Sequence, residues 1–173
     1  MFTRPGEIIN FLKEKGYLHS GMNGADFGCG SGYFSVLLAN IVGPQGLIYA
    51  IDIQEDVLNE AKEFANNFKI KNIRFLKQDL EKNSGLENNS VDFVFISQVL
   101  YQSENPELIL KEAYRVLKNN GLLIIYEPKE SNFLFSGQNV HPQEKIEEIC
   151  KNIGFKIIED RDWGAYFLLI FEK

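Results

Sequence analysis

The 173-residue sequence has few of the residues that build disulfide frameworks or metal sites. Its two cysteines, Cys29 and Cys150, are too few for a disulfide framework and have no companions at metal-ligand spacing. The only two histidines, His19 and His141, argue against a histidine-based zinc site. We therefore predict a protein without a bound metal ion.

Long apolar runs are also missing. A membrane-spanning helix needs about 20 consecutive apolar residues, and no stretch approaches that length. The N-terminus has Pro5, Gly6 and Glu7 where a secretion signal would have an uninterrupted apolar segment. These absences predict a cytoplasmic protein without a membrane span.

Positive charge is scarce: 18 Lys and Arg against 24 Asp and Glu give a net charge of −6. This balance disfavours attraction to a polyphosphate backbone, and so argues against a nucleic-acid partner. No repeat, low-complexity tract or linker interrupts the chain. With 45% hydrophobic residues, we expect a single domain over residues 1–173, with residues 1–20 as an N-terminal helix and possible lid.

Strand-like and helix-like apolar patterns alternate along the sequence. Strands are predicted at 23–28, 47–51, 72–76, 91–97 and 122–126, and helices at 5–15, 32–42, 57–68, 108–117 and 146–153. Phe68 is assigned to the buried face of the third helix. Two last strands, 155–159 and 166–171, have so short a connection that they must be antiparallel. The order predicts a doubly wound α/β domain whose sheet is mostly parallel.

A glycine loop lies between the first strand and the second helix. Gly28, Gly30 and Gly32 occupy alternate positions, where glycine lets the backbone turn sharply and approach a ligand closely. A dinucleotide fingerprint needs a third small residue where this chain has Tyr33, and no P-loop motif is present. The loop therefore favours a nucleoside ligand without phosphate.

Two acids follow neighbouring predicted strands downstream of this loop. Asp52 comes directly after the strand 47–51, and Asp79 follows the strand 72–76. Strand ends in such a sheet line the ligand crevice, where an acid can accept hydrogen bonds from ribose hydroxyls. Alone, each acid is better explained as a solvated turn residue than as a ligand-binding group. Together with the glycine loop, they predict a nucleoside site.

The sequence resembles class I S-adenosylmethionine-dependent methyltransferases over nearly its whole length. The resemblance rests on the loop 26–32, on Asp52 and Asp79, and on the segments 92–100 and 112–122. The last segment is similar to the branch that contains quinone-biosynthesis and arsenite methyltransferases. The resemblance implies S-adenosylmethionine as cofactor and S-adenosylhomocysteine as product. It also implies a seven-stranded sheet of order 3-2-1-4-5-7-6, with the last strand antiparallel and helices on both faces.

The resemblance assigns roles to individual positions. The glycine loop, including Phe27 and Cys29, would admit the methionine part of the cofactor, and Asp26 would orient that loop. Asp52 would bind the ribose hydroxyls and Asp79 the adenine amino group. The remaining assigned residues would lie against the adenine ring or near the reacting methyl group: Ile53 and Leu80 at the ring, Ser97 at the methyl. For Ile53 and Leu80, ordinary core packing is the alternative.

The acceptor side is less defined. Where the related branch has two histidines after the fourth strand, this chain has Tyr101 and Gln102, which removes an obvious base. Tyr101 is expected either to position the acceptor or to pack. Segments 1–4 and 128–142 are candidate lids. The reaction expected is in-line methyl transfer to an O, N, S or C atom of a small molecule.

Two alternative functions remain at this point. One is an S-adenosylmethionine-binding regulatory or partner subunit without activity of its own. The other is a nicotinamide dehydrogenase, which Tyr33 disfavours. An oligomer is possible, because the last hairpin places a strand near a sheet edge that is able to pair between chains.

Overall fold

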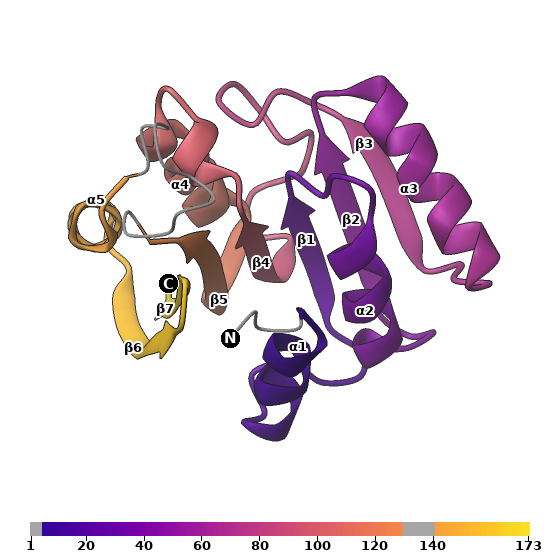
Figure 1. Cartoon of the computed structure of the whole chain (residues 1–173), viewed down its shortest axis with the longest axis horizontal. Helices are drawn as coiled ribbons and strands as arrows, with labels where there is room; N and C mark the ends of the chain where they lie inside the picture. The colour runs from indigo at the N-terminus through magenta and orange to yellow at the C-terminus, as the bar shows by residue number, and fades with distance from the viewer. Residues whose placement is uncertain (1–4, 130–140) are drawn as a thin grey trace.

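The protein folds around one seven-stranded sheet, seen in a computed structural model that describes residues 5–129 and 141–173 (Figure 1). The strand order is β3-β2-β1-β4-β5-β7-β6. Neighbours among β1 to β5 pair in parallel, whereas β7 is antiparallel to both β5 and β6. The predicted fold class, strand order and reversed last strand are confirmed. The strands are β1 (Asn23–Phe27), β2 (Leu47–Asp52), β3 (Ile73–Lys77), β4 (Val91–Ser97), β5 (Leu117–Pro128), β6 (Lys156–Trp163) and β7 (Tyr166–Glu172).

Helices cover both faces of the sheet (Figure 1). One apolar cluster joins the sheet to α1 and α2 through residues such as Leu12 and Leu38. A second joins the opposite face to α4 and α5 through residues such as Ile109 and Ile146. No helix in the described ranges is both long enough and apolar enough to cross a membrane. The helices are α1 (Pro5–Glu14), α2 (Tyr33–Val42), α3 (Glu55–Asn67), η1 (Leu100–Gln102), α4 (Pro106–Val116) and α5 (Gln143–Ile153).

Two strands are longer than the sequence patterns predict. β5 begins at Leu117, five residues before the predicted strand 122–126, and includes Asn120 with a φ of 61°. β6 continues to Trp163, so the predicted connection 160–164 is mostly strand. The polar residues of that connection pair with β7 and have solvent on their other side, because β6 is the edge of the sheet. Because these residues are polar, their sequence is typical of a loop although they belong to an edge strand.

The predicted burial of Phe68 is wrong. α3 ends at Asn67, one residue earlier, and Phe68 is 59% exposed. Its ring contacts the ring of Phe64 with a centroid separation of 4.9 Å. The helical spacing of apolar residues therefore holds for Ala61 and Ala65, which are buried, and stops where the helix stops.

The centre of the sheet depends on the absence of a side chain at Gly24. Gly24 of β1 is the register partner of Phe93 of β4, and the Phe93 side chain is fully buried. A Cβ on Gly24 would lie 2.1 Å from Cζ of the Phe93 ring. The ring therefore occupies the space that any other residue at position 24 would need.

We predict that Gly24→Ala lowers the free energy of unfolding by about 1–3 kcal/mol, because the core must shift to accept the methyl group. Urea denaturation measures the change. Gly6→Ala in the first turn of α1 is the control, since a Cβ there meets no atom within 4 Å. Equal stability of the two variants would contradict the packing described.

Candidate functional site

The loop between β1 and α2 turns through three glycines with left-handed backbone. Gly28, Gly30 and Gly32 have φ angles of 74°, 52° and 81°, a region that residues with side chains rarely occupy. The N–H groups of Gly28 and Cys29 both donate to the carbonyl of Ile51, at 2.8 and 2.9 Å. The predicted glycine turn is present, and it is tied to the end of β2.

Asp52 lies at the carboxyl end of β2, beside this loop. Its Oδ2 accepts a hydrogen bond from the Gly30 N–H at 3.1 Å, and its Oδ1 accepts one from the Gln54 N–H at 3.0 Å. Each carboxylate oxygen has a second lone pair. The carboxylate therefore orients the loop and still has capacity to accept from a ligand.

Asp26 lies beneath the loop and is 2% exposed. The Ser35 hydroxyl of α2 donates a hydrogen bond to its Oδ2. Burial raises the pKa of Asp26 to about 7, against the opposing effect of the Ser35 hydrogen bond and with a smaller contribution from the charge of Asp52. Asp26 thus changes its charge near neutral pH.

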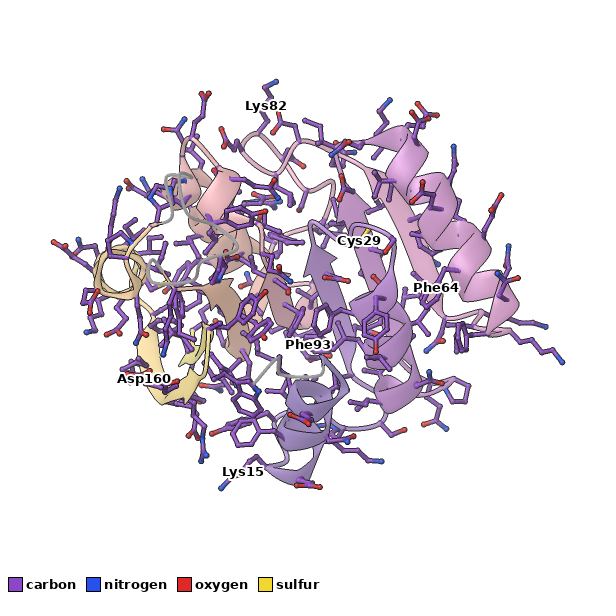
Figure 2. All side chains as sticks on the ribbon, viewed as in Figure 1. Lys15, Cys29, Phe64, Lys82, Phe93 and Asp160 are labelled. Carbon is purple, nitrogen blue, oxygen red and sulfur yellow. The ribbon has the colours of Figure 1, made fainter. Side chains whose placement is uncertain are left out.

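A cavity of about 790 Å³ opens beside the loop and the strand ends. This is within the roughly 300–1,000 Å³ typical of small-molecule sites. Figure 2 labels Cys29, whose side chain packs with Ala50 of β2 and Leu58 of α3. In the described ranges, no three His, Cys, Asp or Glu side chains are grouped to hold a metal ion. The cavity brings together nine residues of the predicted cofactor set: Asp26, Gly28, Cys29, Gly30, Asp52, Ile53, Asp79, Leu80 and Ser97.

Three predicted site residues do not line this cavity. Phe27 is fully buried in the core beneath it. Gly32 allows close packing on α3, because a Cβ on it would lie 2.9 Å from the Cβ of Ala61. Tyr101 lies in η1, and its backbone N–H donates to Oε2 of Glu127 at 3.3 Å. The candidate lid segment 1–4, and residues 130–140 of the candidate lid segment 128–142, lie outside the described residues.

Ser97 and Gly30 show what kind of ligand the cavity suits. The Ser97 hydroxyl oxygen is buried, and it has no hydrogen-bond partner within residues 5–129 and 141–173. Buried polar atoms nearly always have a partner, so this one favours a polar ligand. At Gly30 a Cβ would meet no atom within 4 Å, which leaves the loop backbone open. Both features fit the methionine end of S-adenosylmethionine.

The residues predicted to lie at an adenine ring differ in exposure. Asp79 forms an ion pair with Lys82 at 2.9 Å and accepts a hydrogen bond from the Glu81 N–H; the Lys82 interaction lowers the pKa of Asp79. Leu80 is 8% exposed and belongs to the core as well as to the cavity wall. Ile53 is 57% exposed, so core packing does not explain it.

Sequence reasoning missed Glu127 and most of the segment that follows β4. Glu127 was detectable, because it comes directly after the predicted strand 122–126, as Asp52 does after 47–51. The segment after β4 has no such signal. It contributes Gln98, Val99, Gln102, Ser103 and Glu104 to the cavity wall.

The sheet order, the glycine loop and the strand-end acids together define a Rossmann-like nucleoside-binding domain. Residues 18–171 match a family model described as a methyltransferase domain. The chain therefore belongs to the S-adenosylmethionine-dependent methyltransferase family, and the cofactor of this family is S-adenosylmethionine.

Individual relatives agree with this family. A crystal structure of an S-adenosylmethionine-dependent methyltransferase from Aquifex aeolicus is 29% identical, with a TM-score of 0.85 and coverage of 98% of this chain and 93% of that one. Demethylmenaquinone methyltransferases from Staphylococcus aureus are 30% identical over 138 residues, covering 75% of this chain and 56% of theirs. The chain thus spans about half the length of these curated relatives. The cyclase SpnF is 18% identical, with a TM-score of 0.84 and coverage of 96% and 80%, and so shares the fold alone.

We predict that Asp26→Asn becomes more stabilising, relative to the native chain, as the pH rises from 4 to 8. Between about pH 4 and pH 7 the Asp26 carboxyl keeps its proton in the folded chain but loses it in the unfolded chain, because burial raises its pKa. The free energy of unfolding of the native chain therefore falls as the pH rises through this range. Over that window the difference amounts to about 4 kcal/mol. Urea denaturation at several pH values measures it.

Glu112→Gln is the control, with the opposite sign. Burial alone would raise the pKa of Glu112, but hydrogen bonds from Arg115 and Ser84 lower it. The ionised Glu112 carboxylate therefore stabilises the folded chain above about pH 4.5, and this stabilisation is lost as the pH falls. Parallel pH profiles for native protein and Asp26→Asn would refute the buried-acid description.

Proposed function

We propose that this chain catalyses methyl transfer from S-adenosylmethionine to a small-molecule acceptor. One observation carries the proposal: a single cavity joins an open glycine backbone, two strand-end acids and the Ser97 hydroxyl, which has no hydrogen-bond partner among the described residues. The family membership supports the cofactor and the class of reaction. The acceptor and the in-line course of the reaction belong to the proposal.

In this proposal the methionine end and the adenosine end of the cofactor contact different parts of the cavity wall. Gly28, Gly30 and Ser97 bind the methionine end, where backbone and hydroxyl groups are open to a ligand. Asp52 accepts hydrogen bonds from the ribose hydroxyls with its remaining lone pairs. Asp79 accepts from the adenine amino group. The ring lies between the side chains of Ile53 and Leu80, which both line the cavity.

The chemistry needs little from the protein beyond orientation. Bound S-adenosylmethionine supplies a methyl group already activated by its sulfonium. The chain binds and orients the reactants, and such proximity effects are able to contribute about 7–11 kcal/mol. Burial and the charge of Glu127 raise the pKa of the Tyr101 phenol, so any role of Tyr101 is that of a neutral hydrogen-bonding group. Burial likewise raises the pKa of Cys29, which therefore remains a thiol and no nucleophile.

The charge of the cavity supports a small acceptor that is not a polyanion. Among the described residues, no Lys, Arg or His lines the cavity. A phosphate-rich acceptor would meet a negative wall. Because the Staphylococcus aureus relatives are named for demethylmenaquinone, that compound is the first acceptor to assay. The acids of the wall are Asp26, Asp52, Asp79, Glu81 and Glu104.

We predict that Asp52→Ala weakens binding of S-adenosylmethionine and S-adenosylhomocysteine by about 100-fold, measured by isothermal titration calorimetry. The estimate is the loss of two hydrogen bonds to a charged acceptor, at about 1.5 kcal/mol or more each. Asp56→Ala is the matched control, because Asp56 lies in the exposed first turn of α3 and does not line the cavity.

Absence of binding by the native chain would refute the proposed function. Unimpaired binding by Asp52→Ala would refute the assignment of the ribose end. Tight binding of NAD in the same assay would instead favour the nicotinamide dehydrogenase. Methyl transfer by the purified chain alone excludes the role of a subunit without activity of its own.

A further inference from the structure

We infer that Glu127 is a positioning residue of the methyl-transfer site: its buried carboxylate holds the segment 98–102 against the glycine loop. The inference rests on the proposed function. It assigns a role in that site to a residue that does not itself line the cavity. Glu127 lies near the carboxyl end of β5 and is 2% exposed.

The carboxylate of Glu127 accepts three consecutive backbone hydrogen bonds. Its Oε1 accepts from the N–H groups of Val99 at 2.8 Å and Leu100 at 3.0 Å, and its Oε2 accepts from Tyr101 at 3.3 Å. These are the donors at the start of η1, which have no partner within the turn itself. Within the described ranges Glu127 forms no ion pair, so backbone N–H groups are its observed compensation.

The held segment begins with a strained residue. Gln98 has a φ of 58°, in the left-handed region that side chains other than those of Asn and Asp disfavour. Its N–H donates to the Tyr126 carbonyl at 3.0 Å, and its own carbonyl accepts from the Gln102 side chain at 3.1 Å. Such backbone persists only where surrounding contacts fix it. The three hydrogen bonds to Glu127 begin at the next residue.

Val99 connects this segment to the glycine loop. A Cβ on Gly28 would lie 2.3 Å from Cγ2 of Val99, so the Val99 side chain fills the space that glycine leaves free. The backbone N–H of the same residue is bound to Glu127. A movement of the carboxylate therefore moves the side chain that packs on Gly28, and both Val99 and Gly28 line the cavity.

The other end of the segment is fixed separately. The Ser103 hydroxyl donates to Oε1 of Glu81 at 2.6 Å, and the Ser103 carbonyl lies 3.2 Å from Nε2 of His141. His141 lies two residues before α5, so this contact ties the Ser103 carbonyl to the start of that helix. Loss of Glu127 thus releases the end beside Gly28 and leaves the Ser103 end in place.

The test compares Glu127→Gln with Glu112→Gln. In Glu127→Gln one oxygen remains to accept from Val99 and Leu100, while the amide nitrogen faces the Tyr101 N–H donor. Glu112 is also a buried acid that binds a backbone N–H, that of Ser84, but it lies outside the cavity wall. The measurements are the melting temperature and the dissociation constant for S-adenosylhomocysteine, at a temperature where every variant is folded.

We expect both variants to melt at lower temperature, and only Glu127→Gln to bind S-adenosylhomocysteine less tightly, by about tenfold or more, the equivalent of one hydrogen bond to a charged group. A Glu127→Gln constant within twofold of the native value would overturn the inference, as would equal weakening by Glu112→Gln.

If Glu127→Gln does not fold, Val99→Ala gives the answer, because it keeps the carboxylate and removes the side chain that packs on Gly28. An increased dissociation constant supports the coupling, and a native value overturns it. Failure of the native chain to bind S-adenosylhomocysteine refutes the proposed function itself. Native binding with an unaffected Glu127→Gln refutes the positioning role alone.

Discussion

Carboxylates at the ends of parallel strands hold the loops of this site by accepting backbone N–H groups. Asp52 accepts from Gly30 of the glycine loop, and Glu127 accepts from Val99, Leu100 and Tyr101 of the segment after β4. Loop N–H groups of this kind have no partner in a helix or sheet, and leaving them buried and unpaired is costly. Each acid therefore fixes the segment beside its own strand, and the cavity wall is built from the segments so fixed.

This dependence explains how much the sequence predicted. The glycine positions and the acids after β2 and β3 follow from local patterns, because strand ends and left-handed glycines are visible in a linear sequence. Gly32 shows the limit: it has the predicted backbone, but it packs on Ala61 of α3 instead of lining the cavity. Whether a glycine in such a loop faces a ligand or packs on a neighbouring helix depends on tertiary contacts, and a local sequence pattern does not reveal these.

The segment after β4 was unpredictable for a related reason. Its conformation includes the left-handed Gln98, a residue type that gives no sign of such backbone, and it is held by an acid almost thirty residues further along the chain. The cyclase SpnF shares this architecture at 18% identity, so the fold alone does not specify a reaction. Fold and cofactor loop can be read from sequence motifs, whereas the reaction depends on walls built by distant contacts.

The two most deeply buried acids of the site also connect its stability with its proposed ligand. Burial raises the pKa values of both Asp26 and Glu127 to about 7, so their ionised forms destabilise the folded chain above that pH. Each is nevertheless oriented for the site, Asp26 by Ser35 and Glu127 by three backbone donors. A sulfonium or ammonium group in the cavity would favour the ionised form of Asp26, which lines the cavity, and would lower its pKa. Binding of a cationic cofactor would then release protons and offset part of this destabilisation.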